Sequence, residues 1–265
     1  MPLVGTSLVE DLVQSVALSH LVRGHDRLGL LLLAAPESGK TTIATAAEAA
    51  HVERLTVITA RSLMNLARAP VDGQMVVEFL LFNDMASIRS LSRASMALLI
   101  NTLNQVVQGE KGKAMFAGRE EIKIERQIGV IGCLPFKFFS DQRYQWAHMG
   151  FVSRMLPFAY SYSADLIAVI KDGIDKGRMK SEPSKMPTLK ARSINMSPSY
   201  VAAVRAIADS RAVTLGQIGI RLLKHYHTLI RAHALRHGRS SVTRDDLDFL
   251  RAVDGFISVT ECRPL

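Results

Sequence analysis

The sequence predicts an α/β protein in which a parallel sheet is flanked by helices and followed by a helical C-terminal part. Two observations carry this prediction. Short apolar runs of strand length alternate with helical patterns in the first half of the chain, which is typical of parallel strands joined by covering helices. One such run, Leu28 to Ala35, leads through a short loop into an Ala-rich segment that favours a helix. In this class of fold, ligands bind at the carboxyl ends of the strands.

The predicted elements follow one another in a simple order. Apolar residues recur at three- and four-residue spacings from Val9 to Val22, which predicts an amphipathic helix before the first strand. The basic, proline-containing stretch from Lys171 to Pro198 is predicted to be a linker. Beyond it, Thr243 and Asp246 have the spacing of a capping box. The other elements are strands at 28–35, 55–59, 75–82 and 128–134, helices at 40–50, 88–107, 197–210, 216–237 and 243–253, and a hairpin within 112–127.

The composition excludes several classes of protein. Hydrophobic residues make up 48% of the 265 residues and charged residues 22%, which is ordinary for a folded domain and argues against disorder. The two cysteines, Cys133 and Cys262, give no disulfide framework and no zinc pattern. The apolar run at 28–35 is too short to span a bilayer, so we expect a cytoplasmic protein with no membrane partner. The net charge of +9 favours contact with phosphate backbones.

The loop after the first strand has the pattern of a phosphate-binding loop. Its fixed positions are filled by Ala34, Gly39, Lys40 and Thr41, in the relaxed form of the motif that accepts Ala at the first place. Small residues let backbone N–H groups approach phosphate oxygens, the lysine reaches the β and γ phosphates, and the hydroxyl binds magnesium. We therefore predict that ATP and Mg²⁺ bind here, on Pro36, Glu37, Ser38, Gly39, Lys40, Thr41 and Thr42.

A polar pair, Asn83 and Asp84, follows the third predicted strand. A carboxylate at this place holds magnesium or polarises the attacking water. Two registers are open: either Asn83 takes the metal position and Asp84 the catalytic one, or Asp84 binds the metal together with Thr41. A third reading is that Asp84 only caps a helix that starts at Met85. On the first two readings both residues are catalytic candidates, and the atypical pair predicts slow hydrolysis.

Together with the C-terminal helices, these motifs resemble the AAA+ ATPases, from about Leu28 to Val253. The most specific likeness is the stretch from Leu103 to Leu134. It looks like the helix, β-hairpin and sensor strand of the clade that holds minichromosome-maintenance helicases, magnesium chelatases and MoxR-like chaperones. The resemblance implies a parallel five-stranded P-loop NTPase sheet flanked by helices, with a C-terminal α-helical lid. We expect four parts: a helical lead-in at 1–27, an ATPase core at 28–170, a basic linker at 171–196 and the lid at 197–265.

The same resemblance implies two arginines at the nucleotide. Arg154 matches the arginine finger that is offered to a neighbouring subunit's ATP, where it would stabilise charge on the transferred phosphoryl group. Arg221 matches the arginine that opens the third lid helix and reaches the γ-phosphate. The sequence departs from the family where the sensor strand should end in Asn or Thr, because Cys133 and Leu134 stand there. That departure again predicts a low hydrolysis rate.

The resemblance also implies self-assembly into a ring, expected to be hexameric, or into a filament, with ATP at the contacts between subunits. In the helicase-like arrangement the hairpin faces the central channel, which places Lys113, Arg119, Lys123 and Arg126 near a threaded DNA strand. We therefore predict an ATPase that acts on DNA with other protein components, as a helicase, loader or remodelling motor in replication, transposition or phage DNA processing. Two alternatives stay open: a MoxR-like protein-remodelling chaperone, and a weakly hydrolysing nucleotide-dependent scaffold.

Overall fold

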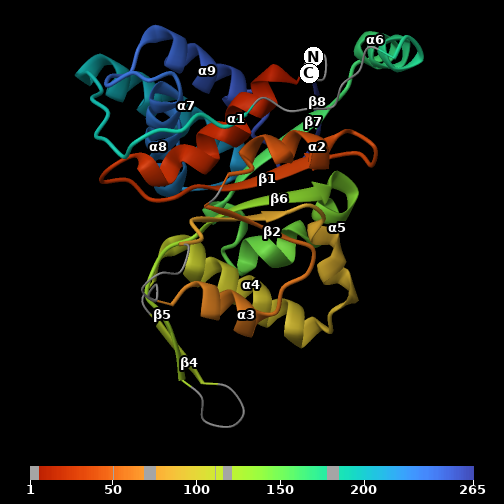
Figure 1. The fold of residues 1–265 in the computed structure, drawn as a ribbon, viewed down its shortest axis with the longest axis vertical. Coiled ribbons are helices and arrows are strands. Elements are labelled where there is room, and N and C mark those ends of the chain that lie inside the picture. Colours follow the sequence, from red (N-terminus) through yellow and green to blue (C-terminus); the bar gives the residue numbers. More distant parts are fainter. Residues whose placement is uncertain (1–5, 50, 69–75, 111, 116–120, 178–184) are drawn as a thin grey trace.

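A parallel sheet forms the centre of the molecule (Figure 1). The computed structural model describes residues 6–49, 51–68, 76–110, 112–115, 121–177 and 185–265. Within these ranges the strands of the sheet are, in spatial order, β2 (Val52–Leu55), β3 (Phe79–Phe82), β6 (Gly129–Pro135), β1 (Gly29–Ala34), β7 (Leu156–Ser161) and β8 (Arg263–Pro264). Each neighbouring pair is parallel. The strands β4 (Gly112–Met115) and β5 (Glu121–Ile124) form a separate antiparallel hairpin.

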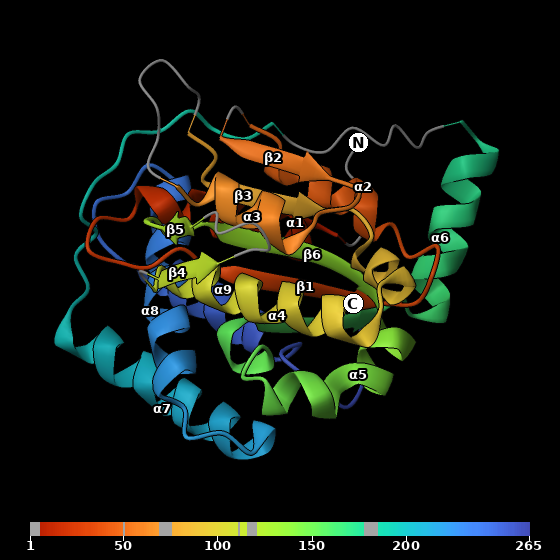
Figure 2. The same cartoon turned by 90° about the horizontal axis from the view of Figure 1, so that it is seen from below.

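Helices cover both faces of the sheet (Figures 1 and 2). In the described ranges they are α1 (Ser7–Leu18), α2 (Lys40–Ala44), α3 (Ala60–Leu66), α4 (Arg93–Gln108), α5 (Phe136–His148), α6 (Ala164–Asp175), α7 (Pro198–Leu215), α8 (Ile220–Arg236) and α9 (Arg244–Asp254). One layer contains α1, α2 and α7 to α9, and the other contains α3, α4 and α5. No helix in the part of the chain described combines the length and apolar character that crossing a bilayer requires.

The central strand β1 shows why the sheet has a helical layer on each face. All of its residues are buried, and its side chains alternate between the two layers as a strand's period of two requires. Leu30 and Leu32 pack in the cluster with α1 and α8, whereas Leu31 and Leu33 pack in the cluster with α4. A continuous run of leucines is therefore apolar on both faces, as expected of a parallel strand that is covered twice.

The C-terminal helices pack onto the first helix. Arg236 of α8 forms an ion pair with Asp11 of α1, with 2.7 Å between Nη2 and Oδ1, and donates to Gln14. The predicted capping box at the start of α9 is confirmed, since the Thr243 amide donates to the Asp246 carboxylate over 2.8 Å. The N-terminal helix is thus part of the same core as the C-terminal helices.

The structure confirms the α/β class and the parallel sheet, and it corrects several details. The sheet has six strands in the described part of the chain instead of five, because the short β8 pairs with the end of β7. The helix predicted at 40–50 is shorter: α2 passes into a 3₁₀ turn at Thr45–Ala47, and Glu48 is extended. The strand predicted at 75–82 begins only at Phe79. Helix α6 runs across the linker boundary expected at residue 171.

Candidate functional site

The glycine-lysine loop lies where the motif places it, at the carboxyl end of β1 and the start of α2. All seven predicted nucleotide contacts, residues 36–42, lie in this loop and the first turn of α2. Gly39 has φ of 71° and Glu37 has φ of 62°, so both residues have a left-handed backbone conformation, which glycine, but not glutamate, adopts without strain. Successive backbone N–H groups in such a loop form a concavity suited to anions.

The Lys40 side chain bends back over this loop. Its ammonium donates to the Ala34 carbonyl over 3.2 Å, to the Ala35 carbonyl and to the Ser38 hydroxyl over 3.1 Å. Partial burial lowers the pKa of Lys40, and the nearby Cys133 and Asp84 oppose that shift. The cation therefore lies inside the concavity that the loop forms.

Two tyrosines at the carboxyl end of the neighbouring strand β7, Tyr160 within it and Tyr162 just after it, contact the loop from the side. The hydroxyls of Tyr160 and Tyr162 donate to the Ser38 carbonyl over 3.1 and 2.8 Å. Burial raises the pKa of both phenols, so they act as neutral donors. These two residues were not predicted, because the contact joins segments far apart in the chain; their place at the carboxyl end of a strand was the available signal.

The polar pair after β3 lies beside the loop. The Thr41 hydroxyl donates to the Asn83 carbonyl over 3.3 Å. The Asn83 Oδ1 atom is buried, with no hydrogen-bond partner in the described part of the chain. Asp84 caps a 3₁₀ helix at Met85–Ser90, where one of its oxygens accepts from the Ala86 amide over 2.9 Å. Asp84 therefore caps the helix that starts at Met85. Thr41, Asn83 and Asp84 lie at the same edge of the sheet.

Cys133 near the end of β6 lies under the same loop. It is buried, and its thiol is 3.7 Å from the Lys40 carbonyl. Burial raises its pKa to about 12, so the thiol is neutral. It occupies the place at which the resemblance predicts Asn or Thr, and the next residue, Leu134, is fully buried. A strong hydrogen-bond donor is therefore missing at these two positions.

The two predicted catalytic arginines lie together at the opposite edge of the sheet. The Arg221 guanidinium donates to the Ser153 hydroxyl over 3.1 Å, and that of Arg154 donates to the Gly150 carbonyl over 2.7 Å. Burial, and then the charge of Arg221, lowers the pKa of Arg154, whose Nε is buried without a partner in the described ranges. Both line a cavity of about 210 Å³ with Arg27, Lys224, His225, Asp26, Glu110, Val107, Gln108, Gln127 and Thr228.

The length of β1 separates this arginine pair from the phosphate-binding motif. A Cβ atom added at Gly29 would lie 3.1 Å from the Arg154 carbonyl, so Arg154 is beside the first residue of β1. The motif starts at Ala34, the last residue of that strand. At about 3.3 Å per residue, these points are roughly 17 Å apart. In this structure both arginines therefore lie away from the loop of their own chain.

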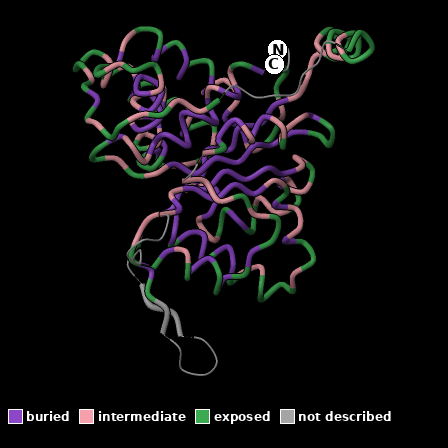
Figure 3. Tube along the Cα trace, viewed as in Figure 1, coloured by how far each residue is buried: buried purple, intermediate pink, exposed green. Residues whose placement is uncertain are grey.

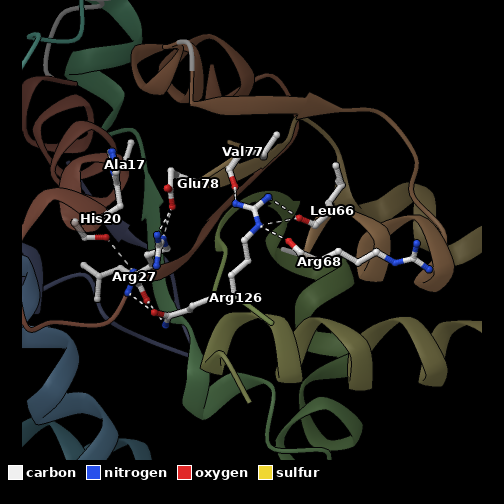
Figure 4. A network of polar contacts seen from close by, with 11 residues as sticks. Ala17, His20, Arg27, Leu66, Arg68, Val77, Glu78 and Arg126 are labelled. Carbon is white, nitrogen blue, oxygen red and sulfur yellow. Dashed lines mark hydrogen bonds and ion pairs between the residues drawn. The ribbon is translucent and has the colours of Figure 1, made fainter. Parts of the chain in front are cut away.

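The four predicted DNA contacts are placed unequally. Lys123 is exposed on β5 and Lys113 is in β4, whereas Arg119 lies outside the described residues. The Arg126 guanidinium donates to the carbonyls of Leu66, Arg68 and Val77, the last over 2.6 Å (Figure 4). Burial lowers the pKa of Arg126. Its side chain ties the base of the hairpin to the neighbouring segments.

The fold and the site together define an α/β protein with a glycine-lysine loop at the carboxyl edge of a parallel sheet. No family model matches the sequence. No curated protein matches it either. Among solved structures, the chain is similar to a "putative ATPase" from Cytophaga hutchinsonii, with 12% identity and a TM-score of 0.49, over 97% of this chain and 82% of that one. A similarity of this size supports no argument about fold or function. The fold is established by the sheet topology, and the function is argued from the site itself.

Proposed function

We propose that the chain is an ATPase that binds ATP with Mg²⁺ on its glycine-lysine loop. The observation that carries the proposal is the position of the Lys40 ammonium on the Ala34 carbonyl and the Ser38 hydroxyl, within a loop whose Glu37 and Gly39 are left-handed, at the carboxyl edge of a parallel sheet. Such a loop offers backbone N–H groups and a cation to the same anion. A phosphate chain is the ligand that matches both.

The residues at this edge also fit a bound magnesium ion. The Thr41 hydroxyl and the Asn83 and Asp84 side chains supply oxygen atoms, the kind of ligand that Mg²⁺ prefers. The buried, unpartnered Asn83 Oδ1 favours the register in which Asn83 takes the metal position. When bound, ATP supplies the phosphoanhydride bond that is cleaved. The chain's own groups would hold its phosphates, orient the metal and, through Asp84, position the attacking water.

We further propose that ATP hydrolysis needs two copies of the chain. The Arg154 and Arg221 pair lies at the amino edge of the sheet and the loop at the carboxyl edge, a strand's length apart. If the copies stack head to tail, the arginines of one copy face the loop of the next and can stabilise charge on the phosphoryl group. A head-to-tail contact of this kind builds rings or filaments.

A nucleotide-binding measurement tests the loop assignment. The Lys40→Ala variant should bind ATP-Mg²⁺ at least about tenfold more weakly than wild type, since the charge contacting the phosphates is lost. Lys190→Ala removes an exposed lysine far from the loop in sequence and should bind normally. Equal affinity for wild type and Lys40→Ala would falsify the assignment.

A mixing experiment tests the contribution of the second copy. Lys40→Ala keeps both arginines and Arg154→Ala keeps an intact loop, so each variant alone should hydrolyse ATP at a small fraction of the wild-type rate. Their mixture should recover activity, because some contacts pair an intact loop with an intact arginine. A mixture no more active than its components contradicts the proposed sharing.

We also propose DNA as the polymer on which this ATPase acts. The net charge of +9 and a hairpin that stands away from the sheet support the proposal (Figure 1). Reversing the charge of the exposed Lys123 in a Lys123→Glu variant should weaken salt-dependent DNA binding several-fold and leave ATP affinity unchanged. DNA binding that is absent, or indifferent to salt and to this substitution, would count against DNA and towards a protein substrate.

A further inference from the structure

Helix α6 has no buried residue, although half of it is apolar. It stands away from the body at the top of the molecule, where Figure 3 colours it exposed and intermediate, without a buried turn. Ile174 is 60% exposed, and Val169 and Ile167 are exposed as well. An amphipathic helix of this length normally depends on packing of its apolar face for stability. The helix therefore presents an apolar surface that its own chain leaves uncovered.

A second exposed apolar surface lies at the turn between α7 and α8. Ile218 is 91% exposed, and Val213 and Ile220 are exposed too. We call these three residues the α7–α8 tip. A shallow apolar groove runs along α7 from Met196 and Pro198 past Val201, Ala202 and Ala206, with Arg205 and Asp209 at its rim. Three large apolar side chains at one turn are more than the scattered exposure that is normal for a folded domain.

The two surfaces belong to opposite edges of the molecule. Helix α6 follows β7, whose end contacts the glycine-lysine loop through the Tyr162 hydroxyl bond to Ser38. The α7–α8 tip continues directly into Arg221, which lies beside Arg154 at the other edge. In Figure 1, α6 and the α7 and α8 pair lie at the same end of the long axis but on opposite sides. Stacking the copies head to tail therefore brings one surface towards the other.

Charge supports the same pairing. Helix α6 carries three aspartates, Asp165, Asp172 and Asp175, against one lysine, Lys171, and Asp172 forms an ion pair with Lys176 just after the helix. The first turns of α8 carry Arg221 and Lys224 and no acidic residue. If the acidic α6 of one copy contacts the basic start of α8 in the next copy, opposite charges attract. A contact between two α6 helices would bring like charges together, so charge favours the head-to-tail contact.

We propose that the apolar face of α6 docks on the α7–α8 tip and groove of the next copy of this chain. The inference rests on the proposed head-to-tail ATPase and names the surface that holds its subunits together. The contact would hold two copies together beside the nucleotide, since α6 starts just after the tyrosines that bond to the loop. Its occupant is a second copy of the chain, and the contact joins unlike faces.

Site-directed cross-linking tests the docking. Two proteins are made in a Cys262→Ser background, one with Ile174→Cys and one with Ile218→Cys, leaving only the buried Cys133 as a native thiol. Mixing them under mild oxidation with ATP-Mg²⁺ should give disulfide-linked dimers. Either protein alone should give none. Leu98→Cys, an exposed position on α4, replaces Ile218→Cys in the matched control and should not cross-link.

Disruption gives a second readout. Ile174→Asp and Ile218→Asp each place a charge in the proposed contact, and each should raise the dissociation constant of the oligomer at least about tenfold. ATP affinity of the isolated chain should stay unchanged, and circular dichroism checks that the variants fold. Association as tight as wild type in both variants overturns the docking. So do dimers formed by Ile174→Cys alone, which indicate that identical faces meet.

The outcomes also separate this inference from the ATPase proposal. ATP binding and nucleotide-dependent oligomers without the cross-link overturn the docking and leave the ATPase intact. The cross-link without any ATP binding supports the docking and removes the ATPase. If Ile174→Asp assembles normally but loses binding to vesicles of phosphatidylcholine and phosphatidylglycerol, α6 serves a lipid surface and the docking is wrong.

Discussion

Asn83 is the residue of the proposed magnesium site that differs most from a strong ligand, which would be a carboxylate. Its side chain supplies a neutral amide oxygen, buried and without a partner in the described part of the chain, where a carboxylate would supply negative charge. Hard cations bind more tightly as the charge of their ligands rises. The Asn83 amide could therefore bind a metal ion, but more weakly than a carboxylate at the same position.

Replacing this amide by a carboxylate should strengthen the site. We expect Asn83→Asp to lower the Mg²⁺ concentration for half-maximal ATP hydrolysis at least about fivefold, because an anionic oxygen replaces a neutral one. The measurement is the hydrolysis rate across a magnesium titration at saturating ATP. Asn83→Leu is the control and should raise the required concentration instead. A titration unchanged by Asn83→Asp would favour the register in which Asp84 binds the metal together with Thr41.

Arg126 stabilises the fold through hydrogen bonds that its place at the end of a charged predicted hairpin does not indicate. Its guanidinium supplies the donors for the Leu66, Arg68 and Val77 carbonyls. Arg126→Ala leaves these acceptors without that donor and should lower the free energy of unfolding by about 2 kcal/mol. Urea denaturation measures the loss, and Lys123→Ala on the exposed side of the hairpin should change little. Equal stability of the two variants would leave Arg126 available for DNA.

At the scale of an element, strand β6 is built on close approaches at its glycines. A Cβ atom at Gly129 would lie 2.0 Å from the Phe79 ring, and one at Gly132 would lie 2.3 Å from the Met85 sulfur. The ring is fully buried and cannot move aside, whereas a thioether chain is flexible. A side chain would therefore destabilise the fold more at Gly129 than at Gly132.

This difference predicts the order of two variants. Gly129→Ala should lower the free energy of unfolding by about 3 kcal/mol, at the upper end of overpacking, and Gly132→Ala by about 1 kcal/mol. Urea unfolding of both variants, with nucleotide affinity as a second readout, checks the order. If Gly132→Ala proves the more damaging, the packing described around β6 is incorrect.

Elements with a strong local signal were predictable from the sequence. The leucine run of β1, the loop after it and the Thr243–Asp246 capping box all depend on neighbours a few residues away. Strand β7 was missed because it contains Pro157, which argues against a strand from sequence alone. Helix α6 was partly assigned to a linker because the basic, proline-containing stretch that resembles one begins inside it, at Lys171.

The candidate site was predictable only in part, for the same reason. The sequence located residues 36–42 and the pair Asn83 and Asp84, since each follows a predicted strand and the carboxyl ends of parallel strands meet at one edge of the sheet. The tyrosine bonds to Ser38 and the carbonyl partners of Arg126 join segments far apart in the chain. No local pattern contains such contacts. That Arg154 and Arg221 lie at the edge away from the loop likewise follows only from the assembled fold.

At the scale of the whole molecule, a pair of histidines links the N-terminal segment to the sheet. The rings of His20 and His51 lie 4.2 Å apart, and His20 also contacts the Phe79 ring. Burial, and then the nearby His51, lowers the pKa of His20 to about 4, and burial also lowers the pKa of His51. Both rings are neutral in the folded state near neutral pH.

The histidine pair predicts acid sensitivity of the fold. The folded pKa of His20 lies below its unfolded value of 6.5, so the unfolded chain takes up protons first as the pH falls. The stability from neutral His20 is complete above pH 6.5 and is lost between 6.5 and about 4. The urea midpoint should therefore fall across this window, and less so in His20→Asn, which cannot titrate. Parallel pH profiles for the two proteins would contradict this role.

The separation of the loop from the arginine pair by the length of β1 has an arithmetical consequence. If the copies stack head to tail as proposed, each copy holds the first half of one reaction centre and the second half of another. An open row of n copies then contains n − 1 complete centres and two idle ends, whereas a closed circle of n copies contains n. Turnover per chain would therefore rise with protein concentration until closure and stay level beyond it, and one defective copy would silence a centre on only one of its sides.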